Sequence, residues 1–451
     1  MLFCGALIAT LMLGGCASFS SDGGRNAVAA MTLERTGAST SPDKTDIADL
    51  LARPLSVGAA VQVALLNNRE LQAALAELGI AEADLVQAGR LRNPAISFGR
   101  LHGGAEVEID RSVMFDLLGI LSMPMRSKIE AGRFEQAKLQ AAAAAVKLAA
   151  ETRRAYFNAV AAAQTDSFMG TVRESADASA ELAQRMARVG NWSKLDAARE
   201  QLFYAESTAQ LARARHNAVA TREQLTRAMG LWGAQADYVL PERLPALPGA
   251  AATMHDIETQ AMQQRLDVQI ARRDAQATAS ALGLTKASSF INVLNLGYTN
   301  KSQTGAPRAN GYEISLELPL FDWSGANVVR AEAIYMQAVH RTAATAIQAR
   351  SEVRVAYSAY RTSYDLARHY QDEIVPLRKR ISDETLLRYN GMLASVFELL
   401  ADARDQVLAV NTLIEAQRDY WLAETDLQMA IQGSGGSLQL QAEAPAQRKA
   451  H

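Results

Sequence analysis

The stretch NPAISFGRLHGGAEVEIDRSVMFDLLG, residues 93–119, decides how the rest of the chain is interpreted. Within it, residues 95–99 and 106–110 alternate apolar side chains with small or acidic ones. An alternation with a period of two is typical of a half-buried β-strand. The dipeptide Gly103-Gly104 stands between the two runs, where a tight turn favours glycine. The stretch therefore predicts a β-hairpin at about residues 94–117.

The sequence on both sides of this hairpin has a helical period instead. The chain has 451 residues, and Ala, Leu, Glu, Gln and Arg dominate it, which is typical of long helices. Apolar residues recur at helical spacing over 56–93, with no breaker before Pro94, and again over 124–189. The second of these helices would be about 100 Å long. Gly190 ends it, and a further helix is predicted to return to Gly233.

The same order of elements then occurs a second time. A helix over 256–289 leads into FINVLNLGYTNKSQTGAPRANGYEISLELPLFDW, residues 290–323, whose alternation predicts a second hairpin at about 290–322. A second long helix follows as far as Tyr389, Gly391 interrupts it, and the helical pattern resumes up to Gln432. The loop of the second hairpin is predicted to hold Gly305, Pro307 and Gly311.

The chain is therefore predicted to be an internal duplication, with repeats at 56–232 and 256–432 joined by the proline-containing linker 233–255. Short matching segments support this interpretation. They are Glu70-Leu71-Gln72 with Asp267-Val268-Gln269, Val107-Glu108-Ile109 with Tyr312-Glu313-Ile314, Phe115-Asp116 with Phe321-Asp322, and Ser193-Lys194-Leu195-Asp196 with Ser395-Val396-Phe397-Glu398.

The N-terminus has the pattern of a secretory signal. A short apolar run over 2–13 ends in Leu13-Gly14-Gly15-Cys16, which resembles a lipobox, whose Cys receives acyl chains such as palmitate. Residues 1–15 would then be the signal peptide, and 16–55 a loose, lipidated leader. Ala17 after the Cys favours the outer membrane, and the tail 433–451 is predicted to be disordered. The alternative is an ordinary signal peptide with a chance Cys.

The strand count predicts an oligomer. Two hairpins give four strands of about ten residues, the length that crosses a bilayer when tilted, and eight strands are the practical minimum for a closed barrel. Open strand edges are not tolerated in lipid. Either the hairpins form an open sheet in water, or several chains share one barrel, and three chains would supply twelve strands. Long Ala-rich helices must likewise pack side by side, although the Ala content also reports helix propensity.

At this point the chain resembles the TolC family of outer-membrane efflux proteins. The resemblance covers about 55–432 and implies a mainly α fold with a β-barrel part. In such a TolC-like homotrimer, long antiparallel helices form a periplasmic α-barrel, and four strands per chain contribute to a shared 12-stranded transmembrane β-barrel. It further implies a passive exit duct served by a periplasmic adaptor and an inner-membrane pump, with the RND type as the leading class of pump. The motifs that carry it are NNRELQAALAELGIAEADLVQA, RLDVQIARRDAQATASALGLTKA, ELPLFD, RYNGMLASVFELLADARDQ and LAETDLQMAIQG.

The alternation in the strands assigns a face to their carboxylates. If the apolar residues face lipid, the acids between them face the lumen, because carboxylates on the lipid face would be costly. Three copies of these acids would favour cations in the pore. The alternative is that some of them pair with Arg100 or Arg111 and serve only structure. The predicted lumen-facing acids are Glu106, Glu108, Asp110, Glu313 and Glu317.

The two interruptions of the long helices are predicted to be tips where one helix reverses into the next. Glu398 and Asp402 share one helix face because they are four residues apart. The resemblance implies that such acids line the constriction that closes the channel; Glu398 matches its position better than Asp402 does, and Asp196 is the counterpart in the first tip. The alternative is a solvated helix face with Arg404 as the partner of Glu398.

The same tips are the predicted docking surface for the adaptor, an expectation that rests on the resemblance more than on single residues. Both glycines are expected at positions that need a positive φ or close approach. The docking residues are Gly190, Asn191 and Ser193 in the first tip, and Gly391, Met392 and Ser395 in the second.

No catalytic or cofactor motif emerges from the sequence. Met114, Met123 and Met125, with His102 nearby, suggest copper, but methionine at such a junction is more often packing. We therefore predict no metal, no cofactor and no enzyme activity, and the net charge of −2 does not indicate nucleic acid. The leading hypothesis is the outer-membrane channel of a tripartite efflux system; the alternatives are a type I secretion channel and a periplasmic coiled-coil scaffold without a pore.

Overall fold

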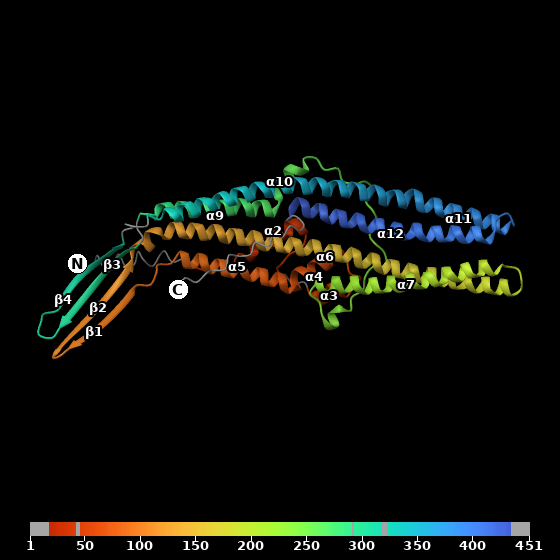
Figure 1. The fold of residues 1–451 in the computed structure, drawn as a ribbon. Helices are drawn as coiled ribbons and strands as arrows, with labels where there is room; N and C mark the ends of the chain where they lie inside the picture. The colour runs from red at the N-terminus through yellow and green to blue at the C-terminus, as the bar shows by residue number, and fades with distance from the viewer. Residues whose placement is uncertain (1–17, 42–45, 291–292, 318–322, 434–451) are drawn as a thin grey trace. The chain divides into compact units, whose positions relative to one another are not determined.

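The computed structural model describes residues 18–41, 46–290, 293–317 and 323–433 (Figure 1). The signal-like segment, Cys16 and the tail 434–451 lie outside these residues. The chain divides into two compact units. Unit 1 comprises Met1–Val28, Ala73–Ala141 and Asp267–Ile347, and unit 2 comprises Ala29–Gln72, Ala142–Leu266 and Gln348–His451. Over the described ranges, no helix is long and apolar enough to cross a bilayer.

Unit 1 contains the sheet. Its strands are β1 (Ala95–Gly103), β2 (Glu106–Asp116), β3 (Val293–Gln303) and β4 (Ala309–Glu317). The order is β1-β2-β3-β4 and every pairing is antiparallel, so the two hairpins join through β2 and β3 (Figure 1). Gly104 takes a φ of 64°, as a tight turn requires. The four predicted strands are therefore present, but Gly311 lies in β4 instead of the loop.

The helix expected to run unbroken over 56–93 is interrupted, which corrects the prediction. It consists of α4 (Val57–Asn67) and α5 (Arg69–Ala88), with Asn68 in an extended conformation between them. The Asn68 side chain stabilises the break, because its oxygen accepts from the backbone of Leu71 at 3.1 Å and its amide donates to the carbonyl of Ala228 at 3.0 Å. Apolar periodicity on both sides of Asn68 hides this short polar cap in the sequence.

The second repeat has an equivalent break at Arg265. This residue separates α8 (Ile257–Gln264) from α9 (Leu266–Ala287) and is also extended. Its buried guanidinium donates to the carbonyl of Ala430 at 3.2 Å and pairs with Glu352 at 2.7 Å. Asn68 and Arg265 therefore have the same role in the two repeats: each bonds to a carbonyl at the end of the helix that returns from the tip.

The first long helix, α6 (Leu117–Arg188), spans 72 residues. It begins seven residues before Pro124, the start that the sequence predicted. The side chain of Asp116 accepts from the backbone of Gly119 at 2.7 Å and so satisfies the first turn. Pro124 lies inside the helix, where its missing donor removes one backbone hydrogen bond.

The returning helix, α7 (Lys194–Ala228), ends before the predicted Gly233. Gly230 ends it instead, with a φ of 69°. A Cβ at this position would lie 3.0 Å from the backbone oxygen of Asn67, so a side chain has no room there. A short 3-10 turn, Gly233–Ala236, follows.

The second long helix is not uniform. It consists of α10 (Gly325–His369), a π-helical turn (Tyr370–Ile374) and α11 (Val375–Asn390), and α12 (Val396–Gln432) follows the tip. Pro376 is at the start of α11, and a continuous α-helix from α10 into α11 would need the N–H donor that this proline lacks. The backbone of Val375 bonds to the carbonyl of Tyr370, which widens the turn by one residue.

The leader, predicted to be loose, contains helix α2 (Arg25–Thr36) and the short α3 (Ile47–Leu51), which corrects that expectation. In unit 2 the guanidinium of Arg153 donates to the carbonyl of Thr36 at 3.0 Å. The Tyr156 hydroxyl donates to the carbonyl of Leu55 at 2.9 Å, and burial raises the pKa of Tyr156 to about 12. The leader is thus held by contacts with α6 that its Ser- and Gly-rich composition did not reveal.

The linker lies against an aromatic cluster in unit 2. Tyr364 donates to the carbonyl of Pro248 at 3.0 Å, and the Trp421 indole donates to that of Pro245 at 3.2 Å. Tyr420 lies between these rings, 5.7 Å from Tyr364 and 5.0 Å from Trp421 between ring centroids. Burial raises the pKa of Tyr420, so its hydroxyl stays neutral.

Candidate functional site

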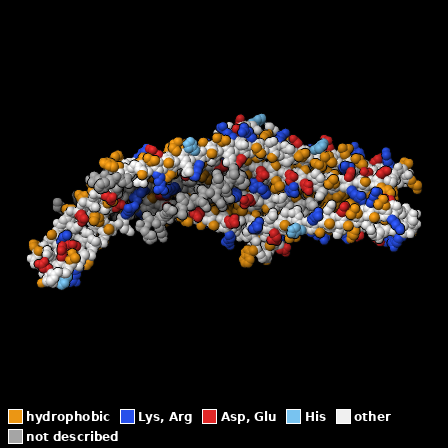
Figure 2. Space-filling view, in the orientation of Figure 1, with side chains coloured by type: hydrophobic (Ala, Val, Ile, Leu, Met, Phe, Trp, Pro, Cys, Tyr) orange, Lys and Arg blue, Asp and Glu red, His pale blue; other side chains and the backbone are white. Residues whose placement is uncertain are grey.

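The register of the sheet places all five predicted acids on one face. Residues directly opposite each other in an antiparallel pair have side chains on the same face. Glu108 lies opposite Gln303, Asp110 opposite Lys301, and Glu106 two residues before Glu108 on the same strand. Glu313 lies opposite Gly297 and Glu317 opposite Val293. Tracing these pairs across the four strands assigns every one of these acids to the same face, which we call the acidic face; Figure 2 shows acidic side chains over the strands of unit 1.

The opposite face, which we call the apolar face, holds the large hydrophobic side chains. Tyr312 is 84% exposed, Ile96 78% and Ile314 71%, although each is apolar over most of its surface. Such exposure over one side of a sheet indicates an interaction with an apolar partner or lipid. Besides these three, its apolar residues include Phe98, Val113, Phe115, Leu294, Leu296, Tyr298 and Leu316.

The register also argues against the alternative that the acids pair with Arg100 or Arg111. Arg100 lies opposite Ile109, and Arg111 lies opposite Phe98 and Asn300. Both arginines are therefore on the apolar face and cannot reach the acids through the sheet. Lys301 does approach one of the five acids, because its Nζ lies 3.6 Å from Asp110.

A cluster at the helix end of the sheet was missed by the sequence analysis. The Arg92 guanidinium pairs with Asp116 at 3.2 Å, and Arg126 donates to the carbonyl of Gly119 at 2.7 Å. A cavity of about 490 Å³ opens beside them, lined also by Met114. The signal that could have found it is the density of arginines around both ends of the hairpin.

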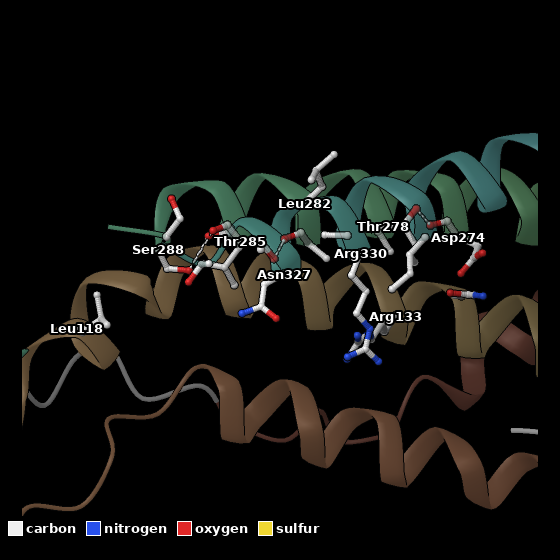
Figure 3. A pocket seen from close by; sticks show the side chains of 17 residues that line it. Leu118, Arg133, Asp274, Thr278, Leu282, Thr285, Ser288, Asn327 and Arg330 are labelled. Atoms are coloured by element: carbon white, nitrogen blue, oxygen red, sulfur yellow. Dashed lines mark hydrogen bonds between the residues drawn. The ribbon is translucent and has the colours of Figure 1, made fainter. Parts of the chain in front are cut away.

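A larger cavity of about 700 Å³ lies among α6, α9 and α10 within unit 1. Its lining includes Arg133 from α6, Arg330 from α10, and Thr278 and Asp274 from α9 (Figure 3). Arg133 is paired with Glu130 at 2.7 Å. These residues come from three segments that are far apart in sequence, so no local motif predicted the cavity.

The methionines of the copper hypothesis do not meet His102. Met114 lies opposite Ala95 and belongs to the acidic face, whereas His102 lies opposite Val107 on the apolar face. Within the described ranges, no group of three His, Cys, Asp or Glu residues is placed to hold a metal ion.

The first tip, between α6 and α7, follows the expectation for a glycine reversal. Gly190 has a φ of 81°, and the amide of Asn191 closes the turn by donating to the carbonyl of Met186 at 3.0 Å. Ser193 caps α7, because its hydroxyl oxygen accepts from the backbone of Asp196 at 3.1 Å. The same hydroxyl lies 2.6 Å from the Asp196 carboxylate, which Arg199 also approaches at 3.4 Å.

The second tip corrects the prediction for Gly391. This glycine has a φ of −81°, which any residue can adopt, and the left-handed residue is Met392, with a φ of 59°. Met392 is also 94% exposed. Ser395 caps α12 by accepting from the backbone of Glu398 at 3.3 Å, so the cap of the first tip is repeated.

The three predicted gate acids differ in their surroundings. Asp196 is held by Ser193, and Asp402 accepts a short hydrogen bond from the Thr385 hydroxyl. Glu398 is exposed, and its carboxylate has no hydrogen-bond or ion-pair partner among the described residues. Arg404, the alternative partner, does not contact it, because its guanidinium pairs with Glu200 at 2.8 Å.

Glu200 is a further residue that the sequence analysis missed. It is 3% exposed, accepts from Ser179 at 2.9 Å and binds Arg404, so it links the α6–α7 hairpin to α12. The rings of Trp192 and Phe397 stack with their centroids 5.4 Å apart and connect the same two hairpins nearer the tips. The repeat could have indicated Glu200, because it stands in the first tip where Asp402 stands in the second.

The comparison with solved structures identifies the fold. CmeC, the outer membrane channel of Campylobacter jejuni, superposes with a TM-score of 0.72 at 18% identity over 83% of this chain and 85% of CmeC. A membrane protein from Pseudomonas aeruginosa gives 0.73 at 20% identity over 84% and 90%, and CusC gives 0.69 at 17% over 88% and 96%. The chain has the TolC-like fold. The predicted fold class of the chain, mainly helical with a four-stranded antiparallel β part, is confirmed.

Among the comparisons with known proteins, only the comparison with solved structures finds this TolC-like fold. No family model matches the sequence. No curated protein matches it either. Identities of 17–20% at TM-scores near 0.7 explain this outcome, because the arrangement of helices and strands persists after most residues have changed.

Proposed function

We propose that the chain is the outer-membrane channel of a tripartite efflux system, a passive exit duct for substrates delivered by a pump and a periplasmic adaptor. Three copies would form a homotrimer, with twelve strands in a shared barrel. The structures that it resembles are outer-membrane channels, including the open state of MtrE from Neisseria gonorrhoeae, which supports the proposal.

The observation that carries the proposal is the two-faced sheet. All five carboxylates lie on one face and most of the large apolar side chains on the other, which is the arrangement of a wall between water and lipid. The order β1-β2-β3-β4 leaves one side of β1 and one side of β4 unpaired within the described sheet. Lipid does not tolerate such edges, so further copies of the chain must pair with them.

The pore-less scaffold accounts less well for this sheet. A scaffold of coiled coils in water has no use for a face on which Ile96, Tyr312 and Ile314 are mostly exposed. The tips support the proposal of a periplasmic adaptor as partner. Gly190, Met392 and their neighbours are exposed and leave room for another helical hairpin. Which cargo passes through the duct is a property of the pump.

The test is conductance. Purified trimers in a planar bilayer should conduct, and the acidic face should make the current prefer cations over anions. A purified chain that stays monomeric, or gives no current even with altered tips, would contradict the channel. Mass spectrometry of the same preparation should find a mature chain that begins at acylated Cys16; an unmodified N-terminus would contradict only the lipid anchor.

A further inference from the structure

We propose that Arg100 and Arg111 form a binding surface for phosphate groups of the lipids in the outer leaflet. The inference rests on the proposed function, because it requires the apolar face to meet lipid. It concerns a contact of the outside of the sheet and is independent of gate and cargo.

The first argument is the separation of charge across the sheet. The strands carry their carboxylates on the acidic face, whereas the apolar face carries Arg100 and Arg111 and no carboxylate. A lipid-facing arginine is costly in the middle of a bilayer, but near its boundary the cost falls to about 0–1 kcal/mol. Two arginines without an acid on the same face therefore indicate an anionic partner that comes from outside the chain.

The second argument is position. Tyr298 and Tyr312 face each other across β3 and β4, with ring centroids 6.0 Å apart, and aromatic rows of this kind occupy the interface between lipid tails and head groups. Arg111 lies in the next row, opposite Asn300, and Arg100 in the row after that. From Leu294 to Asn300 the strand rises about 20 Å, comparable to an apolar band of about 25 Å.

This row lies on the turn side of the tyrosines. Strands β1 and β2 meet at the Gly103–Gly104 turn, and the helices continue from the other end of the sheet. If the helices extend into the periplasm, as proposed, the arginines are at the level of the outer head groups. Lipids of this leaflet carry phosphate groups, for which the fork of a guanidinium is a suitable donor.

The third argument is the way in which Arg111 is held. One guanidinium nitrogen donates to the side-chain oxygen of Asn300 at 3.0 Å, and the Asn300 amide donates to Asn310 at 2.6 Å. This chain of amides fixes the guanidinium across three strands and uses only one of its five N–H donors. Arg100 is exposed, and within the described ranges it has no hydrogen-bond or ion-pair partner. Both groups are therefore available to an anion at the surface.

The chain offers a matched test. Arg100→Gln with Arg111→Gln removes both charges from the apolar face, and Lys301→Gln removes one at a similar height from the acidic face. Detergent-purified trimers are incubated with diphosphorylated lipid A or with its dephosphorylated form, and retained lipid is measured by native mass spectrometry. We expect the double variant to retain at least about tenfold less diphosphorylated lipid than the wild type, since charge-assisted hydrogen bonds are lost. Lys301→Gln should match the wild type.

The outcomes separate this inference from the proposed function. Equal retention by the wild type and the double variant overturns it, as does an equal loss for the dephosphorylated lipid, which would indicate contact with acyl chains only. Conductance of each variant is measured in parallel. If the double variant conducts normally but loses the lipid, both proposals hold; if the wild type binds the lipid without conducting, the surface stands and the channel fails.

Discussion

The two tips are built from the same plan but differ in their acids and in their tightest turn. In each, a serine caps the returning helix, Ser193 in one and Ser395 in the other. The left-handed position three residues earlier holds Gly190 in the first tip and Met392 in the second. The backbone of Met392 is therefore less favourable than that of Gly190, because a side chain disfavours a positive φ.

The acids of the two tips also differ, and here the first tip is the more tightly bonded. Asp196 is bound by its serine, whereas its counterpart Glu398 is exposed and unbonded among the described residues. One turn later, Glu200 is buried against Arg404, while its counterpart Asp402 is half-buried and bonds to a hydroxyl. The first tip thus uses its acids to hold structure together, and the second leaves one free. This difference makes the second tip the better candidate for a gate.

The largest effect is expected from Glu200. Glu200→Ala leaves Arg404 and Ser179 without their partner, and removing one member of a buried ion pair costs about 3 kcal/mol where the other member is partly exposed. Asp402→Ala, its counterpart, loses one hydrogen bond at a half-buried position and should cost about 1 kcal/mol. Denaturant unfolding of the purified protein would measure both free energies.

The double variant Glu200→Ala with Arg404→Ala provides the control. If the pair acts as a unit, the second substitution should add less than it costs alone. Equal destabilisation by Glu200→Ala and Asp402→Ala would remove the distinction between the tips.

Substitutions at the two left-handed positions should change the stability of the protein in opposite directions. Gly190→Ala places a Cβ at a φ of 81° and should destabilise the protein by about 1–2 kcal/mol. Met392→Gly relieves the same conflict and should stabilise it by about 1 kcal/mol. Gly391→Ala is the control, because the φ of −81° at this glycine allows a side chain. Shifts in the thermal unfolding midpoint would show the order of the three, and a stabilising Gly190→Ala would contradict the account.

The sequence predicted what depends on period and repetition. The alternation around Gly103-Gly104 located the first hairpin, and the match of Val107-Glu108-Ile109 with Tyr312-Glu313-Ile314 aligned β2 with β4, whose acids share a face. Both features follow from local side-chain order, which a strand converts directly into faces.

Features that depend on distant partners were not predicted. Asn68 breaks a helix because Ala228 supplies a carbonyl, and Arg265 does so because Ala430 and Glu352 are near. The sequence predicts the reversal at Gly391, but the left-handed residue is Met392. In each case the residue type is compatible with two local structures, and a tertiary contact or a neighbouring residue decides between them.

The smallest change in stability, and the most informative change in function, is expected from Glu398. Its carboxylate is exposed and unbonded among the described residues, so Glu398→Ala should alter the free energy of unfolding by no more than about 0.5 kcal/mol. In the proposed trimer, however, three copies would form an acidic ring at the closed mouth. Removing these side chains should raise the resting conductance severalfold and weaken its preference for cations, because both bulk and negative charge leave the constriction.

Asp196→Ala is the matched control, since this acid has the equivalent position in the first tip and is already bound by Ser193. It should cost about 1 kcal/mol of stability through the weakened cap and leave the conductance unchanged. Recordings from the wild type and both variants in one bilayer system would decide the matter. A conductance that rises with Asp196→Ala but not with Glu398→Ala would assign the gate to the first tip, and the unbonded carboxylate of the second would then be a solvated helix end.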